Sequence, residues 1–254
     1  MTGSEIYILC EGYHDRAFWK GLLTYAGCAS LGGPGKKPSD PWGETVHGGQ
    51  YAFENRNKAF LRVVPAGSKY QLIALAETRL RQRAPKTVTH LIINHDSDSF
   101  ADGTPSTARD IQFSHILQLA KKLDPGAQKS VEHVISVDNG TSKIIAFPWC
   151  STDPPAPGVP NQQTLERLIC SALAAVHKDR PAPLEAWLKS RPSPPPPNPK
   201  EHAFSYLAGW FADKGSYEAF CEALWNDPQV AAELRGQLER QGVWTLIEEI
   251  AEIR

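Results

Sequence analysis

The chain has 254 residues, of which 41% are hydrophobic, and a formal net charge of −1 at pH 7. This length allows one large domain, or a domain with an appendage, around a sizeable core. The near-neutral charge lacks the basic surplus of an autonomous nucleic-acid binder, so any contact with nucleic acid is expected from a local patch or from a partner.

The cysteines and the apolar runs indicate the cellular compartment of the protein. The five cysteines are widely spaced and form no CxxC pair, which argues against a structural zinc site and fits reduced thiols. The N-terminus lacks the features of a signal peptide, and no run approaches the roughly 20 apolar residues of a membrane span. We therefore expect a soluble cytoplasmic protein that makes no membrane contact.

The first part of the chain has the pattern of strands alternating with helices. Residues 5–10, EIYILC, form a short apolar run typical of a buried strand, and from Asp15 apolar residues recur at helical spacing. The Gly- and Pro-rich stretch 30–58 predicts a long loop or an insertion. Residues 60–64 predict a strand, and residues 69–83 predict a helix that ends in a basic turn.

The clearest strand is 88–94, VTHLIIN, which is almost continuously apolar, as expected of a strand covered on both faces. Residues 109–123 then have the pattern of an amphipathic helix. Two further strands are predicted at 131–137 and 142–148, with a hairpin turn at Asn139-Gly140 between them.

The remainder of the chain is predicted to be helical. A helix is expected from Thr164 to His177, and the proline-rich tract 191–200 is expected to be extended. Strands that alternate with helices favour an α/β fold with a mostly parallel sheet flanked by helices. We expect an α/β domain at 1–190 and a helical C-terminal extension at 200–254 that packs on it.

Acidic side chains follow two of the predicted strands. Glu11 comes directly after the first strand, with Asp15 one helical turn later, and Asp96 and Asp98 come directly after the strand 88–94. Ligands of open α/β sheets gather at the carboxyl ends of the strands. Clustered carboxylates repel one another, so this pattern implies either a cation, for which Mg²⁺ is the natural choice, or a carboxylate held protonated.

The two motifs resemble those of the Toprim family. The string YILCEGYHDRAFWKGLL resembles the first Toprim motif, a strand ending in Glu-Gly with an Asp four residues after the Glu, and HLIINHDSDSF resembles the second, a strand ending in Asp-x-Asp. The stretch between them is longer than is usual in the family. The family includes type IA topoisomerases, DnaG-type primases, small maturation nucleases and the overcoming-lysogenization-defect (OLD) nucleases.

The resemblance implies Mg²⁺ or Mn²⁺ and chemistry on a phosphodiester. It would make Glu11 a ligand or general base, Asp96 and Asp98 metal ligands, and Asp15 a ligand or a support acting through a bound water. By analogy with OLD nucleases, Glu166 is a further candidate ligand and Lys178 a candidate contact to phosphate. No tyrosine can be assigned as a topoisomerase nucleophile and no zinc-ribbon spacing supports a primase, so strand cleavage is the most economical chemistry.

Two functions from different classes remain open. The first is a metal-dependent nuclease on DNA or RNA, an effector in anti-phage defence beside a partner ATPase. The second is a non-catalytic Toprim-like module that binds metal or a nucleotide and makes protein contacts. Two smaller features stay secondary: His95 is close enough in sequence to reach the acidic site, and the loop 32–37, GGPGKK, is a basic segment that can touch nucleic acid.

Overall fold

The computed structural model describes residues 4–32, 42, 51–82, 88–99, 118, 121, 128–131, 134–138, 143–190, 204, 207–209 and 213–252. The chain divides into two compact units. The first unit consists of Met1–His95, Ile111–Pro148 and Gly242–Arg254, and the second of Asp96–Asp110 and Trp149–Gln241. Both units are therefore assembled from segments that lie far apart in the sequence.

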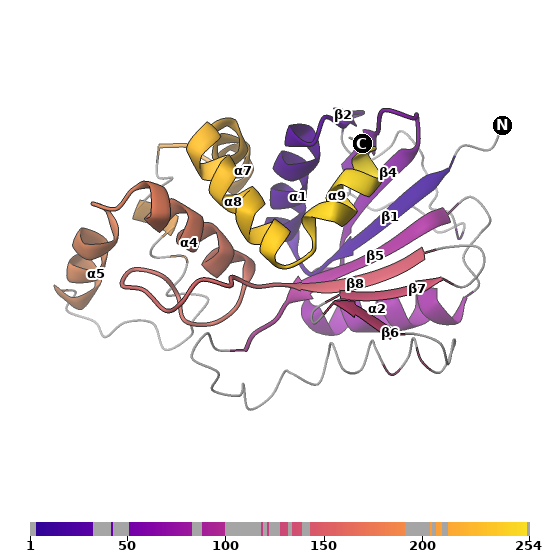
Figure 1. The fold of residues 1–254 in the computed structure, drawn as a ribbon, viewed down its shortest axis with the longest axis horizontal. Helices are drawn as coiled ribbons and strands as arrows, with labels where there is room; N and C mark the ends of the chain where they lie inside the picture. Colours follow the sequence, from indigo (N-terminus) through magenta and orange to yellow (C-terminus); the bar gives the residue numbers. More distant parts are fainter. Residues whose placement is uncertain are drawn as a thin grey trace. The chain divides into compact units, whose positions relative to one another are not determined.

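The described residues of the first unit form a sheet whose strand order is β2-β3-β4-β1-β5-β8-β7-β6 (Figure 1). Its three central strands are parallel, because β1 pairs in parallel with both β4 and β5. The outer pairs β2–β3, β3–β4, β6–β7 and β7–β8 are antiparallel. The strands are β1 (Glu5–Cys10), β2 (Ala29–Ser30), β3 (Tyr51–Glu54), β4 (Phe60–Pro65), β5 (Val88–Asp96), β6 (Gln128–Val131), β7 (Val134–Asp138) and β8 (Lys143–Trp149).

The predicted α/β fold, with helices on the sheet and helices in the C-terminal part, is confirmed. The prediction at 131–137 was only partly correct, since β6 and β7 are two antiparallel strands rather than one. Of the predicted helix 109–123, Gln118 and Lys121 are described and both are helical. The hairpin turn at Asn139-Gly140, most of the loop 32–37 and the tract 191–200 lie outside the described residues. The domain boundary placed in that tract stays a prediction.

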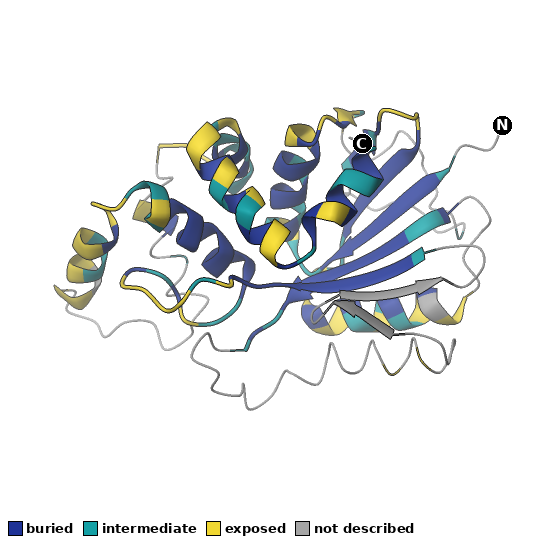
Figure 2. Ribbon diagram, viewed as in Figure 1, coloured by how far each residue is buried: buried dark blue, intermediate teal, exposed yellow. Residues whose placement is uncertain are grey.

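One face of the sheet is covered by α2 (Lys69–Arg81). Tyr7 and Leu9 of β1 form a buried cluster with Leu72 and Ala76 of this helix. Side chains alternate between the two faces of a strand, so Ile6, Ile8 and Cys10 point to the opposite face. Figure 2 shows that the central strands are buried along most of their length.

The opposite face is covered by α1 (Tyr13–Tyr25). Trp19 of this helix is fully buried and donates a 3.0 Å hydrogen bond from Nε1 to Oδ1 of Asn94. Its ring also packs against Phe147 of β8, with 6.1 Å between the ring centroids. Asn94 points away from the α2 face, because the adjacent Ile93 belongs to the cluster on that face.

The last helix of the chain, α9 (Trp244–Ala251), belongs to the first unit. The carbonyl of Ile250 accepts a 2.8 Å hydrogen bond from Asn55. Glu249 accepts hydrogen bonds from Lys143 of β8 (2.6 Å) and from His90 of β5 (3.3 Å). Burial alone would raise the pKa of Glu249, but the hydrogen bonds from Lys143 and His90 hold it below its usual value.

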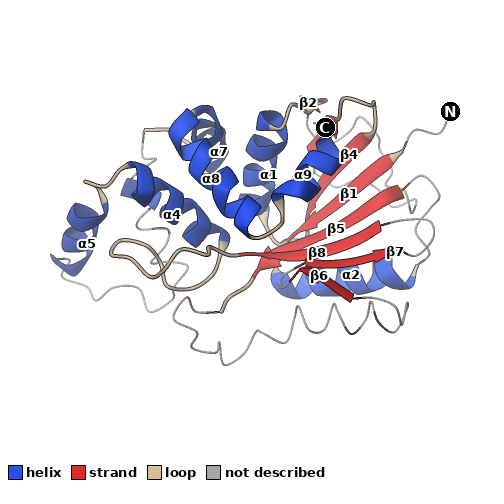
Figure 3. Ribbon diagram, in the orientation of Figure 1, coloured by secondary structure: helices blue, strands red, loops and turns tan. Residues whose placement is uncertain are grey.

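The second unit is helical (Figure 3); α4 and the helices after residue 200 were predicted, whereas α5 was not. Its helices are α4 (Leu165–Val176), α5 (Pro181–Ser190), α7 (Tyr217–Asn226) and α8 (Pro228–Arg240). Gln237 of α8 is buried and donates to the carbonyl of Leu168 in α4 at 3.4 Å. Thr164, Ser216 and Asp227 cap α4, α7 and α8 through their side chains, which satisfies backbone N–H groups at each helix start.

All five cysteines are buried and free of disulfides. Burial raises the pKa of the Cys28 thiol to about 11 and that of Cys150 to about 12, so both are neutral thiols at physiological pH. Cys10 is fully buried in β1, where it packs as a small apolar group. Among the described helices, none is long and apolar enough to span a bilayer.

Candidate functional site

Glu11 lies at the carboxyl end of β1, where the sequence predicts it. Its backbone carbonyl accepts a 3.0 Å hydrogen bond from Gly67, and the carbonyl of Cys10 accepts one from Ala66 at 2.9 Å. Gly67 has a positive φ of 95°, a conformation that strongly favours glycine. The turn that carries Glu11 is therefore fixed to the turn that follows β4.

The two turns lead in opposite directions. The chain leaves β1 into α1 on one face of the sheet and leaves the neighbouring β4 into α2 on the other face. Such a divergence between adjacent parallel strands is the switch point at which ligands bind in open α/β sheets. Glu11 thus occupies the position in the first unit where this fold most often places a ligand.

Asp15 has a clear structural role at the start of α1. It is 95% buried, and its Oδ2 accepts a 2.9 Å hydrogen bond from the backbone N–H of Gly12, the N-cap residue. An acidic residue at the third helical position commonly reaches back to the cap in this way. Capping explains why an aspartate stands here, whether or not it also contributes to a metal site.

Asp96, the last residue of β5, is buried and interacts with the start of α4 in the second unit. Its Oδ1 accepts a 2.8 Å hydrogen bond from the backbone N–H of Leu165, the first residue of α4. Thr164 accepts from the N–H of Arg167 at 3.3 Å. A carboxylate next to the partial positive charge of a helix N-terminus is stabilised as an anion.

Asp98 is buried in a backbone conformation unusual for a residue other than glycine, with φ of 58°. Its N–H donates to the carbonyl of Gln163 at 2.7 Å, and the N–H of Gln163 donates to Ser99 at 2.7 Å. Its Oδ1 accepts from the side chain of Gln162 at 3.1 Å. These three hydrogen bonds around Asp98 fix the segment that follows β5.

Glu166 lies in the first turn of α4 and is 99% buried. The helix N-terminus favours its negative charge. The thiol of Cys170 lies one turn further along the helix; burial, followed by the charge of Glu166, raises the pKa of this thiol. Asp96 and Asp98 therefore contact the chain at the N-terminal end of α4, and Glu166 lies in the first turn of that helix.

Lys178 is exposed and follows His177, the C-cap of α4. The helix has 12 residues and is about 18 Å long at 1.5 Å per residue. Glu166 and Lys178 consequently lie at opposite ends of α4, and within the second unit they are not brought together.

The acidic residues offer the type of ligand that a hard divalent cation needs, because Mg²⁺ and Mn²⁺ prefer carboxylate oxygens. Among the described residues, however, no group of three or more His, Cys, Asp and Glu side chains is placed to hold a metal ion. Mg²⁺ often binds through one or two carboxylates and completes its shell with water and substrate phosphate. An ion bound here would need water and substrate phosphate to complete its coordination shell.

Three amides near these carboxylates did not enter the sequence prediction. Asn94 accepts from Trp19 and donates to the carbonyl of Phe147 at 3.4 Å, linking α1, β5 and β8. Gln163 pairs through both side-chain atoms with the backbone of Ser151, at 2.8 and 2.9 Å. Asn94 could have been identified from the sequence, because it is a polar residue in an apolar strand. Gln162 and Gln163 could not, because they lie in a segment that is polar throughout.

Comparison with known proteins gives a structural match without a function. No protein-family model and no curated protein matches the sequence. The structure is similar to the crystal structure of a hypothetical protein from Pyrococcus horikoshii OT3, with a TM-score of 0.67 and 18% sequence identity over 97% of this chain and 98% of that one. At this identity the likeness shows a shared fold over nearly the whole length of both chains.

Proposed function

We propose that this protein is a divalent-metal-dependent phosphodiester hydrolase of the Toprim type, a nuclease that acts in the cytoplasm. One observation carries the proposal: acidic residues stand at the carboxyl ends of two adjacent parallel strands, β1 and β5. Cys10 of β1 is level with Asn94 of β5. Glu11 follows Cys10 directly, and Asp96 is two residues beyond Asn94.

In this proposal Glu11, Asp96 and Asp98 hold Mg²⁺ or Mn²⁺, which would supply charge neutralisation at the phosphate and a more acidic bound water. Glu11 is the least buried of the three and is the candidate general base. The hydrogen bonds of Asp96 to Leu165 and of Asp98 to Gln162 orient these two carboxylates before any ligand binds. Asp15 and Glu166 are proposed as outer supports, and Lys178 as a phosphate contact.

A cluster of aromatic and basic side chains on α1, the helix that follows Glu11, and on β3 supports a nucleic-acid substrate. The guanidinium of Arg16 lies 5.0 Å from the ring centroid of Tyr13 and 4.3 Å from that of Tyr51, and the ammonium of Lys20 lies 5.6 Å from the Tyr51 ring. Tyr13 is 58% exposed. Exposed rings next to cations bind single-stranded nucleic acid by stacking and by charge. We call these four residues the α1–β3 cluster.

The net charge of −1 is consistent with an effector that depends on a partner for much of its affinity for nucleic acid. We therefore propose a partner ATPase and a role in anti-phage defence, by analogy with the family that the two motifs resemble. An ATPase gene adjacent to this one, and copurification of the two products, would support that association.

The alternative is a Toprim-like module that binds metal or a nucleotide without catalysis. The absence of a three-ligand group among the described residues favours it, because metal-dependent phosphodiester cleavage relies on ions that the protein holds in a fixed geometry. The two functions predict different results: the module retains ligand binding without turnover, whereas the nuclease loses turnover when a single carboxylate is neutralised.

The test is a cleavage panel of plasmid, single-stranded DNA and tRNA with Mg²⁺ or Mn²⁺. Wild type is compared with Glu11→Gln and Asp96→Asn, and with Glu239→Gln as a control that neutralises an exposed carboxylate on α8. The nuclease predicts cleavage by wild type and the control, with a loss of at least about 100-fold in the two site variants. If all four proteins are inactive on every substrate, and wild type shows no calorimetric Mn²⁺ binding, the nuclease proposal is wrong.

A further inference from the structure

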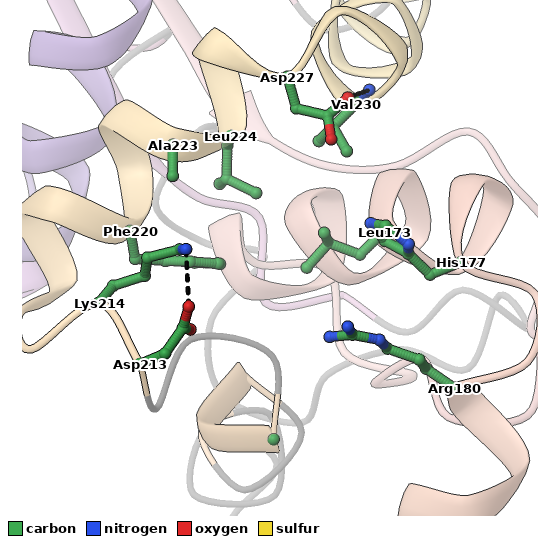
Figure 4. A pocket seen from close by; sticks show the side chains of 11 residues that line it. Leu173, His177, Arg180, Asp213, Lys214, Phe220, Ala223, Leu224, Asp227 and Val230 are labelled. Atoms are coloured by element: carbon green, nitrogen blue, oxygen red, sulfur yellow. Dashed lines mark hydrogen bonds and ion pairs between the residues drawn. The ribbon is translucent and has the colours of Figure 1, made fainter.

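A cavity of about 450 Å³ lies inside the second unit, apart from the acidic residues (Figure 4). Small-molecule sites usually measure roughly 300–1,000 Å³, so this volume is sufficient for a small ligand. Its apolar wall is formed by Leu173 of α4, by Phe220, Ala223 and Leu224 of α7, and by Val230 of α8. We call it the α4–α7 pocket.

Two carboxylates line the pocket, and both already have partners. Oδ1 of Asp227 accepts hydrogen bonds from the backbone N–H groups of Gln229 (2.9 Å) and Val230 (3.2 Å), which caps α8. Asp213 forms an ion pair with Lys214 at 2.8 Å. These acidic groups therefore offer little to a cationic ligand.

Two further basic side chains, His177 and Arg180, line the pocket beside Lys214. Among the described residues, the side chains of His177 and Arg180 make no hydrogen bond or ion pair. Arg180 is exposed, and Figure 4 shows its guanidinium extending from the backbone toward the interior of the pocket. The same view places Leu173 and His177 on one side of the space and Phe220, Ala223 and Leu224 on the other. The pKa of Asp213 is lowered first by its hydrogen bond from Lys214 and also by the charge of Arg180, so Arg180 combines a positive group with an apolar wall in a pocket that also contains a carboxylate.

We propose that the α4–α7 pocket binds a small organic anion. Its apolar part packs between Leu173 and Leu224, and its carboxylate or phosphate is held by Arg180, with His177 beside it. The planar guanidinium donates two parallel hydrogen bonds that match either anion. This site is independent of the proposed nuclease chemistry, because neither the acidic residues of that site nor Lys178 line the pocket.

The test uses 8-anilinonaphthalene-1-sulfonate, an aromatic anion whose fluorescence rises in an apolar site. It is titrated into the full-length wild type and into two pocket variants, Arg180→Gln and Ala223→Leu. The first removes the charge and should weaken binding about tenfold, the effect of one charged hydrogen-bond partner. The second fills the pocket from its wall and should also weaken binding at least about tenfold.

The matched control is Lys189→Gln, which removes a positive charge from an exposed ion pair with Glu185 on α5, outside the pocket. It should bind the dye as wild type does, with all variants showing the same thermal melting temperature. Displacement by decanoate and by decyl phosphate, with decanol as the neutral comparison, then separates the two anion types. The proposal is overturned if Arg180→Gln behaves like Lys189→Gln, if Ala223→Leu binds normally, or if decanol displaces the dye as well as the anions do.

Discussion

Oδ1 of Asp96 accepts a 2.8 Å hydrogen bond from the backbone N–H of Leu165, a residue 69 positions later in the chain. The residue that the sequence singles out as a metal ligand is therefore also the group that satisfies the first turn of α4. A substitution at this position changes helix stability and any chemistry at the same time, so the two effects have to be measured separately.

Asp96→Asn and Asp96→Ala should separate them. The amide oxygen of Asn can still accept from Leu165, so Asp96→Asn should keep the free energy of unfolding within about 0.5 kcal/mol of wild type, whereas Asp96→Ala should lower it by about 1–2 kcal/mol. Urea denaturation measures both. Equal stability of the two variants would mean that the hydrogen bond to Leu165 contributes nothing to folding.

Asp98 should tolerate glycine better than alanine. Its φ of 58° is accessible to Gly without strain, while Ala adopts this region at a cost of about 1 kcal/mol. Both substitutions remove the hydrogen bond from Gln162, so this loss cancels in the comparison. Asp98→Gly should be the more stable of the pair by about 1 kcal/mol in urea denaturation, and the reverse order would exclude strain at this residue.

Glu249 should contribute to stability only above acidic pH. Its pKa is lowered in the folded state, so its contribution is present above the unfolded value of roughly 4.3 and is lost as the pH falls through the folded value. The side chain is 39% exposed, so Glu249→Gln should cost no more than about 1 kcal/mol at pH 7. Unfolding curves from pH 7 to pH 3 should show this difference shrinking toward zero.

The matched variant is Glu77→Gln, which neutralises a carboxylate in an exposed ion pair with Arg81 on α2. We expect a smaller effect from it at pH 7, because an ion pair within one helix contributes only about 0.3–0.5 kcal/mol. A difference between wild type and Glu249→Gln that persists unchanged at pH 3 would contradict the assigned role of Lys143 and His90.

The α1–β3 cluster should bind single-stranded nucleic acid in the absence of metal. Tyr13→Ala and Arg16→Gln should each weaken binding of a fluorescent oligothymidine about tenfold, since stacking contributes about 1–3 kcal/mol per base. Fluorescence anisotropy in EDTA measures binding without cleavage. Tyr70→Ala, which removes an 82% exposed ring on α2, is the control and should bind as wild type does. Identical affinities for all four proteins would remove the cluster from the proposed substrate path.

The central elements could be predicted from the sequence because local pattern and final environment agree there. Residues 88–94 are almost continuously apolar, and the strand they form is mostly buried in the middle of the sheet. The helices α1, α2 and α4 follow the same logic, since each has an apolar face at helical spacing. Glu11 and Asp96 were likewise visible, because each stands where an apolar strand ends.

Other features depend on partners that are remote in the chain. Strands β2 and β3 lie in a stretch that predicts a long loop, and their short, partly exposed sequences become strands only by pairing at the edge of the sheet. The cap that Asp96 provides to α4 and the contact of Glu249 with Lys143 join residues 69 and 106 positions apart. No periodicity within a short window encodes such pairs.

The composition of the first unit from Met1–His95, Ile111–Pro148 and Gly242–Arg254 has a consequence for biosynthesis. During translation the N-terminal strands emerge first, but α9, which supplies partners for Asn55, His90 and Lys143, is made after the whole second unit. Domains that are continuous in sequence can fold in order as they leave the ribosome. Here the first unit stays incomplete until Trp244–Ala251 has emerged, so its native packing is reached only after nearly all of this chain has been synthesised.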